Sequence, residues 1–137
     1  GNSPGTLMVQ GDYQQGADAA LFIELGGTEQ GVKFDYLDIS GQATIEGRIE
    51  VSLVDSFSPL HGASFEFLSA LGGVLGVFNQ LTCTNCIGTG VSFEVEYGTN
   101  FANLNAVVAP VPLPGAVWLL LSALGVFVGI RQRRKTI

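Results

Sequence analysis

Residues 37–53 read LDISGQATIEGRIEVSL. Apolar residues occupy every second position at both ends of this stretch, and Gly41 and Gly47 separate its two halves. An alternation of period two places the apolar side chains on one face of a β-strand. Glycine adopts the backbone conformations that tight turns require. The stretch therefore predicts two short strands, joined through glycine turns, each with one face in a core.

The same alternation recurs through residues 1–109, where helical periodicity is missing. Glycines or Gly-Gly pairs separate the alternating runs. The apolar positions are Leu7 and Val9; Leu21, Ile23 and Leu25; Leu37 and Ile39; Ile49, Val51 and Leu53; Phe65 and Phe67; Phe93 and Val95. Short alternating strands with turn residues between them are typical of sandwiches, barrels and β-solenoids. The sequence therefore predicts an all-β body.

Two pairs of segments repeat at nearly constant spacing. Residues 7–11 (LMVQG) match residues 37–41 (LDISG) at an offset of 30. Residues 21–25 (LFIEL) match residues 49–53 (IEVSL) at an offset of 28. This predicts two copies of a two-strand unit that bury each other's inward face. We therefore expect a short β-solenoid, similar to a parallel β-helix; an antiparallel meander is the alternative, because it also alternates.

The chain begins with a turn that leads into these short strands. The residues concerned are Gly1, Ser3, Pro4, Gly5, Thr6, Leu7, Val9, Gly11 and Tyr13. Their order resembles the terminal part of autotransporter and filamentous-haemagglutinin-like β-helix proteins, over residues 1–57. The resemblance implies that Gly1 marks a break within a longer solenoid, which leaves the first strand edge uncovered.

An uncharged segment, residues 113–130, reads LPGAVWLLLSALGVFVGI. As a helix it would be about 27 Å long, close to the roughly 30 Å of a bilayer core. It is apolar on every face, whereas a buried core helix, the alternative, shows a polar stripe. The RQRRK cluster that follows predicts a cytoplasmic end. We therefore expect a single C-terminal transmembrane α-helix, with everything before Pro110 outside the membrane.

A short proline signature precedes this segment, and a basic cluster follows it. The signature is Val111, Pro112, Leu113 and Pro114, and the basic residues are Arg131, Arg133, Arg134 and Lys135. This order resembles the VPLPA variant of the PEP-CTERM sorting domain of Gram-negative bacteria, with Gly115 in place of the usual alanine. The resemblance implies cleavage near the signature by exosortase, a membrane protease-transpeptidase.

This resemblance divides the chain into an acidic extracytoplasmic β domain, residues 1–109, and a sorting signal, residues 110–137. It implies a bacterial inner-membrane protein whose body is periplasmic or extracellular and reaches the cell surface after cleavage. The implied partners are the lipid bilayer and exosortase, and then envelope polysaccharide or other membrane subunits.

The charges are segregated along the chain. All 12 acidic residues lie between Asp12 and Glu96, where only Lys33 and Arg48 oppose them. Phosphate binding requires a basic surface. The acidic body therefore excludes nucleic acid as a partner.

The two cysteines form the motif Cys83-Thr-Asn-Cys86. A thioredoxin-like redox site would place this motif at a helix N-terminus, whereas the surrounding residues predict a loop between strands. Zinc needs about four ligands, and His61 is the only other soft candidate. Close cysteines in exported proteins usually form a disulfide. We predict a structural disulfide, with free thiols and a redox or metal role as alternatives.

The sequence predicts no catalytic residue, cofactor site or metal site. His61 lies in a turn-like Ser-Pro-Leu-His-Gly stretch without a nucleophile motif. The carboxylates Asp12, Asp18, Glu24, Asp35, Asp38, Glu46 and Glu50 lack a calcium-loop pattern. We expect them to form a solvated acidic face.

These features favour an exported, non-enzymatic envelope or extracellular-matrix protein that carries an exosortase sorting signal. One alternative is an accessory subunit that its helix retains in a larger membrane complex. A second alternative is a redox protein built on the CxxC motif.

Overall fold

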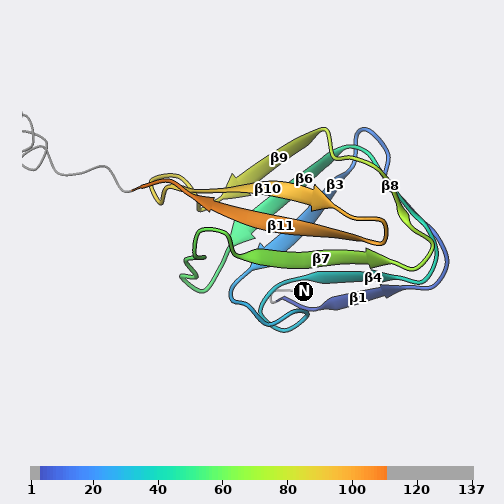
Figure 1. Ribbon diagram of the computed structural model, residues 1–137, viewed down its shortest axis with the longest axis horizontal. Helices are drawn as coiled ribbons and strands as arrows, with labels where there is room; N and C mark the ends of the chain where they lie inside the picture. Colours follow the sequence, from blue (N-terminus) through green and yellow to red (C-terminus); the bar gives the residue numbers. More distant parts are fainter. Residues whose placement is uncertain (1–3, 111–137) are drawn as a thin grey trace, which may run out of the picture.

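The computed structural model describes residues 4–110, which form eleven β-strands (Figure 1). The strands are β1 (Thr6–Val9), β2 (Tyr13–Gln14), β3 (Ala20–Leu25), β4 (Tyr36–Ile39), β5 (Ala43–Ile45), β6 (Arg48–Leu53), β7 (Ser64–Ala70), β8 (Val74–Gly76), β9 (Gln80–Thr84), β10 (Val91–Tyr97) and β11 (Phe101–Val108). This part of the chain holds no helix that could cross a membrane. The predicted all-β body is confirmed, and the predicted transmembrane helix lies outside the described residues.

The first nine strands pass three times through the same three sheets. Sheet A contains β1, β4 and β7, sheet B contains β2, β5 and β8, and sheet C contains β3, β6 and β9. All these neighbours are parallel. We call each passage a coil: β1–β3 form coil 1, β4–β6 form coil 2 and β7–β9 form coil 3. Parallel neighbours need a crossover connection, and the other two strands of each coil supply it.

The residues that match in the sequence repeat are the ones that pair across the parallel strands. Between β1 and β4, Leu7 pairs with Leu37 and Val9 with Ile39. Between β3 and β6, the pairs are Leu21 with Ile49, Ile23 with Val51 and Leu25 with Leu53. Each inward side chain stacks on its equivalent in the next coil, so the spacing of the repeat is the length of one coil.

The prediction of two copies of a two-strand unit is wrong in two respects, because each coil has three strands and there are three coils. Strands β2, β5 and β8 have only two or three residues, too few to show an alternation. In β7, Phe67 and Leu68 are both buried, and the pairing of β7 with β11 is irregular at this point. That irregularity changes the phase of the alternation and hides the third copy.

The core lies between the three sheets and is made of inward residues of all three coils together with residues of β10 and β11. Its largest fully buried side chains are Phe65, Phe67, Leu25, Ile39, Ile45, Ile49, Leu68, Leu104 and Val51. The Phe65 ring meets the rings of Phe34 and Phe57 edge to face, with centroids 5.5 and 5.9 Å away. Such pairs add to the stabilisation that burial gives.

Glycines form a column at the corner that leads from sheet A to sheet B. The Gly41 N–H donates to the Gly11 carbonyl, and the Gly72 N–H donates to the Gly41 carbonyl, each at 2.8 Å. A Cβ on Gly72 would lie 2.8 Å from the Gly41 carbonyl carbon, closer than carbon atoms approach without a shift. The coils therefore pack backbone against backbone at this corner.

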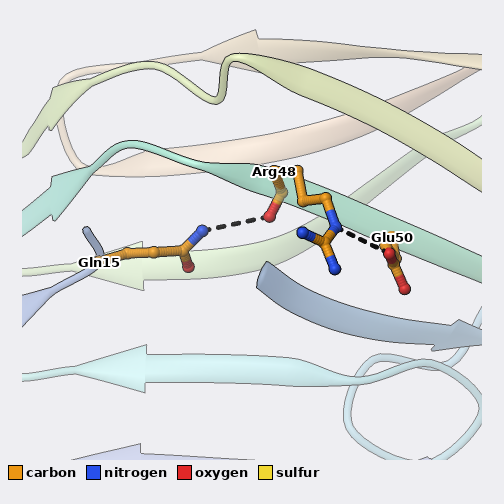
Figure 2. Close-up of polar contacts among 3 residues, drawn as sticks. All are labelled: Gln15, Arg48 and Glu50. Atoms are coloured by element: carbon orange, nitrogen blue, oxygen red, sulfur yellow. Dashed lines mark hydrogen bonds and ion pairs between the residues drawn. The ribbon is translucent and has the colours of Figure 1, made fainter. Parts of the chain in front are cut away.

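Gln15, directly after β2, is the one buried polar side chain of the described body. Its Nε2 donates to the carbonyl oxygen of Glu46 (2.8 Å), in the turn between β5 and β6, and to that of Arg48 (3.1 Å), the first residue of β6. Its Oε1 accepts from the Tyr13 hydroxyl at 2.9 Å. Figure 2 shows the Gln15 amide directed at the Arg48 backbone, while the Arg48 side chain turns to Glu50. The buried amide thus joins coil 1 to coil 2 with its hydrogen bonds satisfied.

Strands β10 and β11 form an antiparallel hairpin that joins sheet A beside β7. Figure 1 shows the hairpin on the side of β7 away from β1, with β10 next to β9 of sheet C. At the end of β10, the Tyr97 hydroxyl accepts from the Phe78 N–H at 2.8 Å. The hairpin therefore covers the core at the coil 3 end. At the coil 1 end, no strand within residues 4–110 pairs with the outer edges of β1, β2 or β3.

Two tyrosines should make the stability fall at alkaline pH. Burial raises the pKa of Tyr13 and that of Tyr97, and the Phe78 N–H lowers the latter in part. A raised pKa in the folded state means a contribution that is complete below the unfolded pKa, about 10. It is lost as the pH rises through the folded pKa. Urea unfolding of the full chain in a non-ionic detergent, from about pH 8 to about pH 11, measures this loss. The double variant Tyr13→Phe/Tyr97→Phe should flatten it, and an unchanged alkaline slope in that variant would contradict the assignment.

Candidate functional site

All the predicted sorting residues lie outside the part of the chain that the structure describes. Val111, Pro112, Leu113, Pro114, Arg131, Arg133, Arg134 and Lys135 lie outside residues 4–110. Their roles stay predictions. The cysteine pair, His61 and the acidic residues lie inside, where their surroundings can be compared with the predictions.

Cys83 and Cys86 lie at disulfide-bonding distance, with their Cα atoms 5.7 Å apart. Cys83 is in β9, where it pairs with Val51 of β6, and Cys86 is buried in the turn that follows. This proximity agrees with the predicted disulfide, although the motif begins within a strand and not in a loop. Between the cysteines, Asn85 has a φ of 68°, in the left-handed region that asparagine tolerates better than most residues. Its Nδ2 donates to the Leu53 carbonyl at 3.0 Å.

This turn borders a hollow of about 550 Å³ at the carboxyl ends of β6 and β9. The other wall is the connection from β6 to β7. The lining residues are Leu53, Val54, Asp55, Ser56, Phe57, Ser58, Asn85, Thr89 and Val91. Asp55 and Ser56, each with a φ of 56°, and Asn85 are the non-glycine residues with positive φ among the described ones. All three therefore lie around one hollow, and unusual backbone conformations of this kind cluster at functional sites.

The hollow is lined by both apolar and polar groups. Leu53, Phe57 and Val91 supply the apolar surface, and Asp55 supplies a carboxylate. The Thr89 hydroxyl accepts from the Val91 N–H at 3.1 Å and donates to the Cys86 carbonyl, which fixes the turn. Such a mixture suits a polar ligand with one apolar face. Sequence reasoning identified Cys83 and Cys86 but none of the lining residues, because their assembly depends on coil 2 and coil 3 being neighbours.

A second, smaller hollow of about 350 Å³ lies on the outer face of sheet C. Its wall includes the exposed ring of Phe22 and the carboxylates of Glu24 and Glu50. The Nε of Arg48 lies 2.8 Å from a Glu50 carboxylate oxygen (Figure 2). Glu50 is thus already partnered and is not free to act alone on a ligand.

His61 is exposed in the connection from β6 to β7, as predicted for a turn residue. Its Nδ1 accepts from the Val108 N–H of β11 at 3.0 Å, so it ties this connection to the hairpin. No group of three or more His, Cys, Asp or Glu side chains that could hold a metal ion occurs in residues 4–110.

The carboxylates that we expected to be solvated include two that bond to the backbone. Asp12 accepts from the Gln42 N–H at 2.8 Å. Asp35 accepts from the Gly5 N–H with one oxygen and from the Glu24 N–H with the other, at 2.9 and 2.7 Å. These two acids therefore hold loops in place. The simple alternation argument missed this, because both lie outside the strands.

Replacing Cys83 and Cys86 together with serine should leave the coils intact. The bond closes a loop of only four residues, for which the chain-entropy estimate is about 2 kcal/mol. We expect the free energy of unfolding to fall by no more than about that amount, as measured by urea unfolding of the full chain. Wild-type protein in reducing agent is the matched control, since it loses the bond and keeps both sulfur atoms. Loss of the β-sheet circular dichroism signal, or of an activity, would show that the cysteines do more than brace this turn.

Neither the protein-family models nor the curated proteins compared with this chain give a match.

Proposed function

We propose that this is an exported, non-enzymatic cell-envelope or extracellular-matrix protein whose coiled body is delivered by a C-terminal exosortase sorting signal. The observation that carries the proposal is the order of parts in the tail. The signature Val111–Pro114 precedes an uncharged segment, and the basic cluster at Arg131–Lys135 follows it. An apolar segment with basic residues at one end is what anchors and orients a chain in a bilayer.

The body fits this role as a short β-solenoid. Its support is the three coils in register, which bury the inward residues of neighbouring coils against one another. The acidic exterior favours solubility outside the membrane and opposes edge-to-edge association of strands. In this proposal the chain resides first in the bacterial inner membrane, with the lipid bilayer and exosortase as partners. The body then reaches the cell surface, where envelope polysaccharide is the expected surrounding.

Mass spectrometry of the mature C-terminus tests the sorting signal. Protein recovered from the cell surface should end near Val111–Pro114 and lack the RQRRKTI end. The double variant Pro112→Ala/Pro114→Ala should keep that end and stay in the membrane fraction. Pro110→Ala is the matched control, because it removes a neighbouring proline outside the signature and should be processed normally.

The second candidate is a retained accessory subunit of a larger membrane complex. Its support is a set of small residues in the apolar segment, which permit close helix contact: Ala116, Ser122, Ala123, Gly125 and Gly129. An intact RQRRKTI end on the functional protein would decide for retention and against sorting. Turnover of a glycan or a peptide by the purified protein, lost when one carboxylate is replaced, would contradict both candidates.

A further inference from the structure

Two exposed aliphatic side chains lie at the end of the body where β11 ends. Ile87, in the connection from β9 to β10, is 98% exposed, and Leu60, in the connection from β6 to β7, is 79% exposed. Single exposed apolar residues are common on protein surfaces. What distinguishes these two is their shared position, because both connections lie at the end of the body from which the chain leaves β11 (Figure 1).

Hydrogen bonds to the last residues of the body fix that position. The Val108 N–H donates to Nδ1 of His61, which directly follows the exposed leucine, at 3.0 Å. The Ala109 N–H donates to the carbonyl of Gly90, in the connection from β9 to β10, at 2.9 Å. Both connections are therefore held beside Pro110, the last residue that the structure describes.

Each of the two side chains is presented by a closed turn. The Ala63 N–H donates to the Leu60 carbonyl at 3.0 Å, and the Thr89 N–H donates to the carbonyl of Cys86, directly before the exposed isoleucine, at 3.1 Å. A surface that is ordered before it binds loses less conformational entropy on binding. The two turns therefore present their apolar side chains in a form suited to contact with another surface.

These two connections are also uncharged. No Asp, Glu, Lys or Arg occurs in residues 56–63 or 85–91, although all 12 acidic residues of the chain belong to the body. Asp55 is the acidic residue that lies nearest to either stretch in the sequence. A membrane surface that contains anionic lipids is negative and repels carboxylates. This end can therefore approach such a surface more closely than the acidic faces of the body can.

The tail keeps this end of the body close to the membrane in the proposed function. There the uncharged segment that begins at Leu113 spans the bilayer, and only Val111 and Pro112 separate it from Pro110. Three residue steps span at most about 11 Å even when fully extended. The two connections beside Pro110 then lie within reach of the membrane surface for as long as the tail is attached.

We propose that Leu60 and Ile87 insert into the lipid surface and dock the body on the bilayer in one orientation. The inference rests on the proposed function, because the anchor brings this end of the body to the membrane. Two aliphatic side chains bind lipid weakly by themselves, and the attached anchor supplies the high effective concentration that makes their contact persist. The docked body holds the signature Val111–Pro114 at the membrane surface, where a membrane protease can reach it.

Tryptophan fluorescence in lipid vesicles tests the docking. The chain has one tryptophan, so Trp118→Phe gives a background to which either Leu60→Trp or Ile87→Trp is added. The full chain is reconstituted in phosphatidylcholine vesicles with or without bromine atoms on the acyl chains, which quench nearby tryptophans. Each new tryptophan should lose at least about half of its fluorescence in the brominated vesicles, because interfacial apolar groups are buried about 5–10 Å into the headgroup and acyl boundary.

Leu71→Trp in the same background is the matched control. Leu71 is 78% exposed, nearly the same as Leu60, but it follows the opposite end of β7. The seven residues of β7 separate the two ends by about 20 Å, so this tryptophan should keep its fluorescence. Equal quenching of Leu60→Trp and Leu71→Trp would mean that the body has no preferred face toward the membrane, which overturns the proposal.

A charge at one turn tests whether both turns form one surface. Adding Ile87→Asp to the Leu60→Trp chain should restore most of the fluorescence, because a carboxylate resists transfer into the acyl region. Adding Leu71→Asp instead should leave the quenching unchanged. If Ile87→Asp has no effect on the tryptophan at position 60, the two turns do not dock together and the proposal is wrong.

The chain with its natural tryptophan separates a failure of this inference from a failure of the proposed function. Quenching of Trp118, with none in Leu60→Trp or Ile87→Trp, would leave the anchor in place and overturn only the docking. Without quenching of Trp118, the uncharged segment does not enter the bilayer, and both proposals are wrong. A second copy of the chain that covered the two turns would shield the new tryptophans from bromine, which also overturns the docking.

Discussion

Replacing Phe65 with alanine should lower the free energy of unfolding by about 3–5 kcal/mol, the usual cost of removing a fully buried phenylalanine ring. Phe65 is 1% exposed, and it lies in β7 opposite Leu104 of the hairpin. Its ring meets those of Phe34 and Phe57 edge to face. The loss therefore removes burial and two aromatic contacts at once, and it leaves a cavity between the coils and the hairpin that covers them. Urea unfolding of the full chain in a non-ionic detergent measures it.

Phe22→Ala is the matched control for this change. Its ring is on the outer face of sheet C and 64% exposed, so truncation should change the free energy of unfolding by no more than about 0.5 kcal/mol. The intermediate variant Phe65→Leu keeps most of the volume and should cost clearly less than alanine. Equal costs for Phe65→Ala and Phe22→Ala would mean that Phe65 is not in a packed core.

Replacing Gly47 with alanine should destabilise the body by about 2–4 kcal/mol, through a strained backbone and a steric clash together. Gly47 is buried between β5 and β6, and its φ is 71°. L-residues pay for this left-handed conformation. An added Cβ would also meet the carbonyl oxygens of Ala19 and Gly16 in coil 1, the latter at 2.6 Å. Those carbonyls cannot move away cheaply, because the Ala19 oxygen already accepts from the Arg48 N–H.

Gly88→Ala separates the two causes. Gly88 also has a positive φ, 82°, but a Cβ there would have nothing within 4 Å. Only the backbone strain remains, so the expected cost is about 1 kcal/mol. The difference between the two variants is the cost of the close approach between coils. If both alanine variants lower the free energy of unfolding equally, coil 1 does not pack against Gly47 as closely as the structure shows.

The sequence predicted much of the fold because strand alternation is a local property. Leu37, Ile39, Ile49 and Val51 all face the core, as their spacing indicates. The matched spacing of two segments also predicted the parallel register, since stacked coils place equivalent residues side by side. These inferences need no knowledge of distant contacts.

The candidate site was predictable only in part. The prediction that Cys83 pairs with Cys86 followed from their separation of three residues and from the expected export of the chain. The hollow beside it could not be predicted, because its lining residues Asp55 and Thr89 are far apart in the sequence and come together only in the folded chain. The positive φ values of Asp55 and Ser56 could not be predicted either, because a glycine would indicate such a conformation more clearly than aspartate or serine does.

By itself, the sequence determined the all-β class, the inward face of most strands and the length of a coil, because alternation and repeat spacing are written in neighbouring residues. It also carries the tail signature on which the proposed sorting depends. Only the tertiary structure decided that residues 4–110 form three coils and that β10 and β11 cover the core at the coil 3 end. Those features depend on which distant strands lie side by side. A two-residue strand such as β2 is too short to show an alternation, and the two consecutive buried residues Phe67 and Leu68 interrupt it.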